Sequence, residues 1–243
     1  MRSLPVLYQD EHLIVVNKPS GLLVHRSPID RHETEIAMQI VRDQVGQWVY
    51  PLHRLDKSTS GALVFALDQE TARRMTVSFT DAQVSKQYLA IVRGFTGEGD
   101  RIDHPLKDPE KVTHREESGD KPGRPSVTEY RRLATVELTQ PVGRYPTARY
   151  SLIAASPLTG RTHQIRRHMK HIFHPVVGDT TYGDGKQNEF FRTKFNCHRL
   201  LLHASTIAFT HPWTGLRLFL HAPLDQEFHA VLEALQWDKI AVA

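Results

Sequence analysis

The residues best suited to chemistry form the run His53-Arg54-Leu55-Asp56-Lys57-Ser58-Thr59-Ser60-Gly61, which an apolar stretch follows. Asp56 lies between two basic residues, Arg54 and Lys57, and nearby cations favour the charged form of a carboxylate. The run therefore predicts an ionised carboxylate held in a polar turn. The same residue types also make ordinary surface turns, so the run alone does not distinguish a functional site from a turn. Matching signals in other segments are needed.

A second candidate lies in the expected strand 86–93, where alternation places Lys86, Tyr88 and Ala90 on one face. The ring of Tyr88 can bound a flat ligand, and its hydroxyl can take part in moving a proton. The alternative is a half-buried strand aromatic, which is the commoner role of a tyrosine.

The third candidate is the segment Gly160-Arg161-Thr162-His163-Gln164-Ile165-Arg166-Arg167-His168, which we expect to begin a helix. Helical spacing puts Ile165, Met169 and Ile172 on an apolar stripe, and His163, Arg166, Arg167 and Lys170 on another face. An arginine on that face can pair with a carboxylate and keep it anionic. An exposed basic face is the alternative.

These segments, together with residues 174–183 and 202–204, resemble in order the motifs of the RluA-type pseudouridine synthase family, with Phe173 where many members have Gly. The resemblance implies that Asp56 is catalytic, that Tyr88 lies in the uracil pocket, and that Arg166 pairs with Asp56. Arg161 is the second choice for that pair. It also implies that Arg54 enters the space left by a flipped base, and it assigns RNA contacts to His53, Arg161, His163 and Arg167.

The implied reaction is the isomerisation of uridine to pseudouridine in RNA, which needs no cofactor and requires the base to leave the helix. Residues 24–31, 38–44 and 143–147 resemble a branch of the family that modifies uridine 65 on the acceptor-stem side of certain tRNAs. A synthase acting on rRNA is the alternative within the family. Outside enzymes, the rival is an RNA-folding chaperone of the same fold. A glycoside hydrolase is a poorer reading, since Asp56 has only Asp179 as a distant second carboxylate.

The sequence predicts an α+β fold with a mostly antiparallel central sheet, flanking helices and a central active cleft, as the resemblance also implies. We expect strands at 13–17, 62–67, 86–93, 127–138, 149–155, 200–209 and 216–221, and helices at 34–45, 69–80, after 160 and at 224–237. Residues 1–243 are expected to form a single catalytic domain without an N-terminal RNA-binding module, with a surface insertion at about 97–125.

The chain has 243 residues and a net charge of +4, which suits a polyanionic partner. The one cysteine, Cys197, and the absence of a signal peptide or long apolar run predict a cytoplasmic protein without membrane contact, expected to be a monomer with tRNA as its partner. His168, His171 and His174 recur every third residue near His163. We expect them to face RNA, and we expect no metal, because no zinc-binding motif accompanies them.

Overall fold

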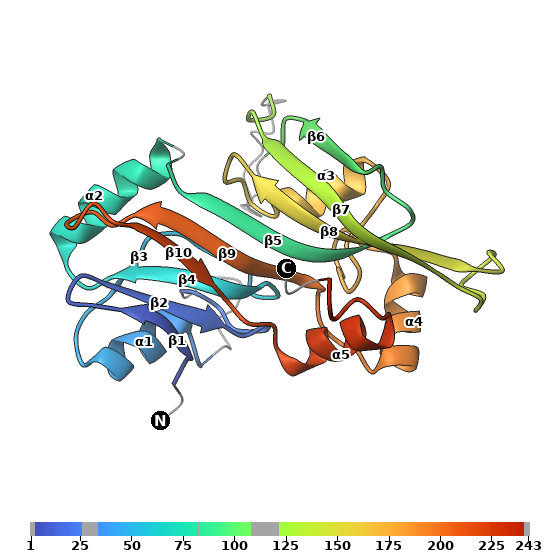
Figure 1. The fold of residues 1–243 in the computed structure, drawn as a ribbon, viewed down its shortest axis with the longest axis horizontal. Helices are drawn as coiled ribbons and strands as arrows, with labels where there is room; N and C mark the ends of the chain where they lie inside the picture. Colours follow the sequence, from blue (N-terminus) through green and yellow to red (C-terminus); the bar gives the residue numbers. More distant parts are fainter. Residues whose placement is uncertain (1–2, 26–33, 82, 108–121, 241–243) are drawn as a thin grey trace, which may run out of the picture.

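The computed structural model describes residues 3–25, 34–81, 83–107 and 122–240. Ten strands in these residues form one sheet with the order β1-β2-β4-β9-β5-β8-β7-β6; β3 also pairs with β4, and β10 with β9 (Figure 1). The strands are β1 (Val6–Gln9), β2 (Leu13–Lys18), β3 (Tyr50–Pro51), β4 (Ser60–Ala66), β5 (Ser85–Arg93), β6 (Gly99–Asp103), β7 (Val127–Leu138), β8 (Ala148–Pro157), β9 (Leu202–Thr210) and β10 (Arg217–His221).

All but one of the strand pairs are antiparallel, which confirms the predicted sheet type. The exception is the parallel pair β4–β9, in which Ser60 lies opposite His203 and Gly61 opposite Ala204. This pair joins the N-terminal strands to the rest of the sheet. The loop that carries Asp56 leads directly into β4, so it lies beside this junction.

Five helices are described: α1 (Ala37–Val45), α2 (Gln69–Thr80), α3 (Gln164–His171), α4 (Gly185–Phe195) and α5 (Gln226–Ala234). Asp68, Asp184 and Asp225 cap α2, α4 and α5 by accepting hydrogen bonds from backbone N–H groups of the first turn. These caps satisfy donors that a helix leaves without internal partners.

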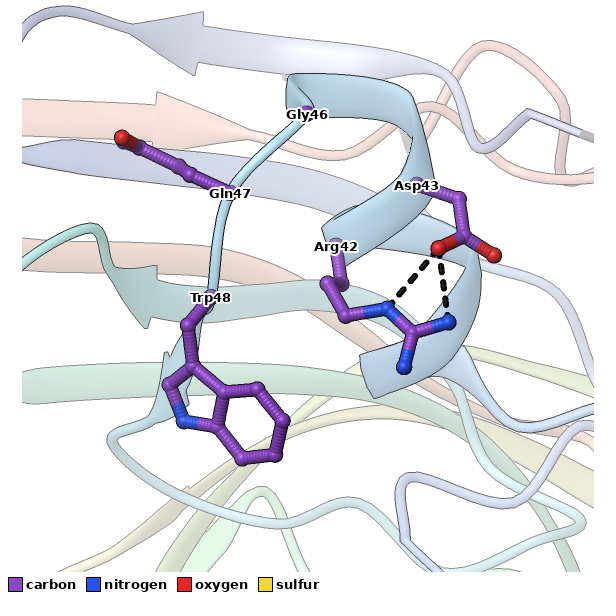
Figure 2. Close-up of a pocket in the computed structure, with 5 residues that line it drawn as sticks. All are labelled: Arg42, Asp43, Gly46, Gln47 and Trp48. Atoms are coloured by element: carbon purple, nitrogen blue, oxygen red, sulfur yellow. Dashed lines mark hydrogen bonds and ion pairs between the residues drawn. The ribbon is translucent and has the colours of Figure 1, made fainter.

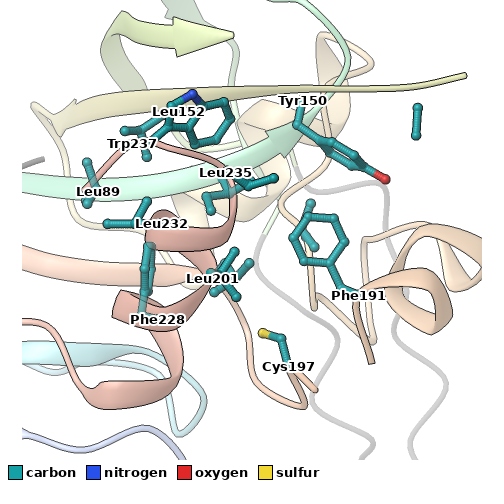
Figure 3. Packing of buried hydrophobic residues seen from close by; sticks show 14 of the residues in the cluster. Leu89, Tyr150, Leu152, Phe191, Cys197, Leu201, Phe228, Leu232, Leu235 and Trp237 are labelled. Carbon is teal, nitrogen blue, oxygen red and sulfur yellow. The ribbon is translucent and has the colours of Figure 1, made fainter. Parts of the chain in front are cut away.

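The alternation of β5 assigns the helices to the two faces of the sheet. Ala90 packs in a core cluster with Ile165 and Met169 of α3. Leu89 and Ile91 belong to a second cluster, which includes side chains of α4 and α5. Figure 3 shows Leu89 in this second cluster, together with Phe191 and Phe228. The apolar residues of α1 pack with Leu63 and Phe65 of β4, and Tyr88 contacts both this cluster and that of α3. Tyr88 therefore lies where the α1 and α3 clusters meet on one face.

The expected strands and helices are present, with ends that differ by a few residues. Four elements were not predicted: the short strands β1 and β3, the edge strand β6 and the helix α4. Strand β6 lies within the segment 97–125 that was expected to be a surface insertion, and it pairs with β7. Residues 108–121 of that segment lie outside the described part of the chain.

Candidate active site

The loop between β3 and β4 holds Asp56 by burying its neighbours. Leu55 is buried, and the ring of His53 stacks on Phe79 at 5.3 Å while its Nε2 accepts a hydrogen bond from the Val64 N–H at 3.2 Å. Asp56 keeps about a quarter of its side chain exposed. The loop therefore presents a carboxylate to solvent from a backbone that is fixed on either side.

Arg166 on α3 forms the expected contact with Asp56. Its Nη1 donates to Asp56 Oδ2 at 3.2 Å, and only 6% of the arginine side chain is exposed. Burial strengthens this attraction, because little solvent screens the two charges. Among the described residues, the other oxygen of Asp56 accepts no hydrogen bond, and it lies 3.8 Å from His163 Nε2.

Asp179 is a second carboxylate on the same arginine. Nε and Nη2 of Arg166 donate to its two oxygens at 2.7 and 2.9 Å, and the backbone N–H groups of Thr181 and Tyr182 each donate at 2.9 Å. Burial alone would raise the pKa of Asp179, but Arg166 and the two N–H groups hold it below its ordinary value. Asp179 thus orients Arg166, which presents its remaining nitrogen to Asp56.

His163 directly precedes α3 at its N-cap position and has a left-handed backbone conformation, with φ of 54°. Its Nδ1 lies 3.1 Å from the Tyr182 hydroxyl, and its Nε2 faces Asp56. Burial lowers the pKa of His163, although the charge of Asp56 opposes this shift. A neutral imidazole beside an anionic carboxylate can accept or relay a proton.

Tyr88 lies near Asp56 from the strand side. Burial raises the pKa of its phenol, and the negative charge of Asp56 raises it further. The hydroxyl is therefore kept in its neutral form at ordinary pH, able to donate a hydrogen bond. It becomes a base only if its proton is first transferred elsewhere.

Lys18 binds the loop that carries Asp56 by a hydrogen bond to a backbone carbonyl, a role that the sequence did not reveal. The side chain is fully buried, and Nζ donates to the carbonyls of Pro19, Leu22 and Lys57 at 2.9, 2.7 and 3.2 Å. Burial, and then the cation of Arg199, lower the pKa of Lys18 to about 7, while Asp56 acts in the opposite direction. Through the Lys57 carbonyl, this lysine fixes the residue after Asp56.

The remaining predicted RNA contacts are dispersed. Arg54 is exposed, and its Nη1 lies 3.3 Å from His25 Nε2. Arg161 donates from Nε to the Pro125 carbonyl at 3.2 Å, so it does not replace Arg166 in the pair with Asp56. Arg167 follows Arg166 on α3 and is half-buried.

The prediction that His168 faces RNA is wrong. Its side chain is fully buried, with Nδ1 at 2.9 Å from the Thr128 hydroxyl and Nε2 at 3.0 Å from the His104 carbonyl. Burial lowers its pKa, so the ring is neutral and joins α3 to the sheet. His53 is likewise a structural anchor in its contacts, because Val64 occupies its acceptor nitrogen and burial lowers its pKa to about 3.

A pocket of about 390 Å³ lies at the C-terminal end of α1 and contains none of these residues (Figure 2). It is lined by Arg42, Asp43, Gly46, Gln47 and Trp48. Among the described residues, no three His, Cys, Asp or Glu side chains converge as metal ligands, and no helix is long and apolar enough to span a membrane.

The site thus combines a partly exposed, ion-paired carboxylate, Asp56, with a partly buried tyrosine, Tyr88. Residues 12–171, more than half of the chain, match the RNA pseudouridylate synthase family. The chain therefore belongs to this family, whose members isomerise uridine in RNA to pseudouridine.

Comparisons with individual proteins show which members of this family the chain resembles. The chain is 51% identical to tRNA pseudouridine synthase C of Pasteurella multocida (strain Pm70), over 97% of this chain and 98% of that protein. It is 48% identical to tRNA pseudouridine synthase C of Vibrio cholerae (strain El Tor Inaba N16961), over 97% of each. Among solved structures, human RNA Pseudouridylate Synthase Domain Containing 1 aligns with a TM-score of 0.68 and 26% identity, over 96% of this chain and 95% of that one.

Proposed function

We propose that this pseudouridine synthase acts on tRNA and that its target is uridine 65, on the acceptor-stem side. Proteins named tRNA pseudouridine synthase C that are about half identical over nearly the whole chain support the tRNA substrate. The proposal includes a single catalytic domain that acts as a monomer in the cytoplasm without a cofactor. The observation that carries its catalytic part is the network in which Asp179 orients Arg166 and Arg166 holds Asp56.

In the proposed reaction, the bond from ribose C1′ to uracil N1 breaks, the base rotates, and C1′ bonds to C5. The C5 proton leaves and N1 gains one, so the overall change is an isomerisation. Asp56 acts at the sugar–base bond, as a nucleophile at C1′ or as the charge and proton partner of a glycal-type intermediate. Arg166 donates a charge-assisted hydrogen bond to Oδ2 of Asp56 and leaves Oδ1 available.

Tyr88 bounds the uracil ring in this proposal. Its raised pKa makes it a hydrogen-bond donor in the resting enzyme, so it removes the C5 proton only as its own proton passes to another group. Arg54, which is exposed one residue before the buried Leu55, fills the space that the flipped base leaves. Arg161, His163 and Arg167 contact the RNA around the flipped nucleotide.

The test is tritium release from tRNA transcripts labelled at C5 of uridine. We expect release by the wild type and none by Asp56→Asn, which keeps the shape of the side chain and removes its charge. The matched control is Asp43→Asn, which alters an exposed aspartate outside the site and should release tritium like the wild type. A tRNA with cytidine at position 65 should lose the enzyme-dependent signal.

Turnover by Asp56→Asn would contradict the proposed catalytic role of Asp56. Release that persists with cytidine at position 65, or that occurs only with rRNA, would reject the proposed target and leave the chemistry in place. Binding of RNA without release from any substrate would favour the chaperone alternative.

A further inference from the structure

Phe173, directly after α3, combines an unfavourable backbone conformation with almost complete exposure. Its φ is 65°, in the left-handed region that side chains other than glycine rarely adopt. Its side chain is 87% exposed, more than any other large apolar side chain in the described residues. The chain thus bears a conformational cost at a residue that contributes almost nothing to the core.

The backbone around Phe173 explains why this conformation is imposed. The Phe173 N–H donates to the Lys170 carbonyl at 3.0 Å, and the His174 N–H donates to the Met169 carbonyl at 2.8 Å. These two bonds are those of a Schellman motif, in which the residue after the helix cap is left-handed and is usually glycine. His174 is held further by the hydrogen bond between its Nδ1 and the Arg93 carbonyl, at 2.8 Å. A glycine would satisfy the same geometry without strain.

The surroundings of Phe173 are basic rather than apolar. Arg167, Lys170 and His171 precede it on α3, and the ring of His171 stacks on His104 with centroids 3.7 Å apart. Within the described ranges, none of the three α3 residues forms an ion pair with a carboxylate. An apolar protein partner would have to cover these charges, whereas a nucleic acid brings phosphates to them together with flat bases.

Phe173 lies just past the C-terminal end of α3, and Arg166, which binds Asp56, lies near the N-terminal end of the same helix. The Tyr182 ring lies 5.2 Å from the Arg166 guanidinium carbon and 6.0 Å from Lys170 Nζ. Phe173 follows Arg166 by seven residues, which is about 10 Å along a helix axis. That length corresponds to about three base steps of 3.4 Å.

We infer that Phe173 is a base-stacking residue, which takes an unpaired nucleobase of the bound RNA a few nucleotides from the uridine at Asp56. The inference rests on the proposed function for the presence of an RNA substrate, and it adds where on the protein a second base is held. Stacking on an aromatic ring tolerates any base, so Phe173 contributes affinity and register rather than sequence readout. Lys170 and Arg167 hold the adjoining phosphates.

The experiment compares Phe173→Gly with Phe173→Trp, and it uses Phe219→Ala as the matched control. Phe219 is also an exposed phenylalanine, 75% accessible, but it lies on strand β10. Dissociation constants for unmodified tRNA are measured at several salt concentrations, and thermal unfolding is followed without RNA. The binding assays use fresh transcripts at low temperature, so that turnover does not change the ligand.

We expect Phe173→Gly to bind tRNA about tenfold more weakly, within the range of one base–aromatic stack. Its melting temperature should rise by about 2 to 4 °C, because the strained residue is relieved. Phe173→Trp should bind within about twofold of the wild type, and Phe219→Ala should change neither quantity. The salt dependence of binding should be the same for Phe173→Gly as for the wild type, whereas Lys170→Ala should reduce its slope by about one.

Equal affinity of wild type and Phe173→Gly would overturn the inference, as would a loss that Phe173→Trp does not restore. A fall in melting temperature together with weaker binding would indicate a structural role for the side chain, and would also reject the inference. These outcomes are separate from failure of the proposed function, which is judged by tritium release from tRNA by the wild type.

Discussion

Arg166 binds the carboxylates of both Asp56 and Asp179. Comparing it with Arg167, the next residue along α3, tests what the contact with Asp56 contributes to catalysis. We expect Arg166→Met to lower the turnover number by about 10²- to 10³-fold, because Asp56 loses the group that orients and stabilises its charge. Arg167→Met should leave turnover nearly unchanged and weaken RNA binding a few-fold, because Arg167 is half-buried and has no part in the network.

Single-turnover kinetics at saturating RNA separates these two effects. Equal losses of turnover in the two variants would mean that the contact of Arg166 with Asp56 has no catalytic role. Circular dichroism of both variants checks that Arg166→Met, which leaves the buried Asp179 without its cation, retains its fold.

The family resemblance predicted the contact of Arg166 with Asp56, whereas helical spacing predicted only a shared basic face and not the environment of the helix. The pattern placed Arg166 and Arg167 on one basic face, whereas the structure buries Arg166 and also His168. A helical wheel shows which residues share a face, but it does not show how much of the helix the rest of the chain covers. The role of Asp179 was not predicted for a similar reason. Sequence alone indicates that a carboxylate in a turn is exposed to solvent, and it does not show that Asp179 pairs with the buried Arg166.

At the scale of elements, the segment from α3 to α4 carries Asp179, and it passes very close to the backbone before β9. Gly178 has a φ of 80°, and a Cβ placed there would lie 1.9 Å from the Arg199 carbonyl oxygen. We expect Gly178→Ala to lower the free energy of unfolding by about 3 kcal/mol or more, since backbone must move and the left-handed conformation adds about 1 kcal/mol.

The matched control is Gly46→Ala, at the end of α1. Gly46 has a similar φ of 74°, and its added Cβ would meet nothing within 4 Å. Its substitution should therefore cost only about 1 kcal/mol. Urea denaturation measures both variants, and equal losses would show that the close approach at Gly178 relaxes without cost.

Most elements were predictable because their apolar residues recur at strand or helix spacing. Helix α4 was missed because its pattern is weak: Phe191 is its one buried apolar residue, and the buried Gln187 and Asn188 read as surface positions. In the structure, Gln187 contacts the Tyr150 hydroxyl, and Asn188 donates to the Asp179 carbonyl at 2.8 Å. Such polar burial is decided by tertiary partners, which local sequence does not contain.

At the scale of the whole molecule, buried histidines make stability depend on pH. His203 is fully buried; its Nδ1 lies 2.7 Å from the Ser60 hydroxyl, and its Nε2 donates to the Ala222 carbonyl at 2.9 Å. Burial lowers the pKa of His203 to about 4, against an ordinary value of about 6.5. Between these values the unfolded chain binds a proton that the folded chain does not, so stability falls as pH falls through this window.

We expect His203 alone to remove about 2 kcal/mol of the free energy of unfolding between pH 7.5 and pH 5. His203→Gln should be less stable at pH 7.5 but should lose about 2 kcal/mol less on acidification. Urea denaturation at the two pH values measures this difference, with the exposed His229→Gln as control. An unchanged pH dependence in His203→Gln would show that this histidine does not remain neutral in the folded protein.

The position of β9 between β4 and β5 has a consequence for how the protein is made. Ser60 and His203 lie side by side in the sheet but are 143 residues apart in the chain. A ribosome adding about 5 to 20 residues per second needs about 7 to 29 s to pass from one to the other. During that time the edge of β4 that β9 will join has only the two-residue strand β3 beside its far end, and an unpaired strand edge can pair with another chain. Until β9 has emerged from the ribosome, we therefore expect the nascent chain to depend on cellular factors that keep nascent chains apart.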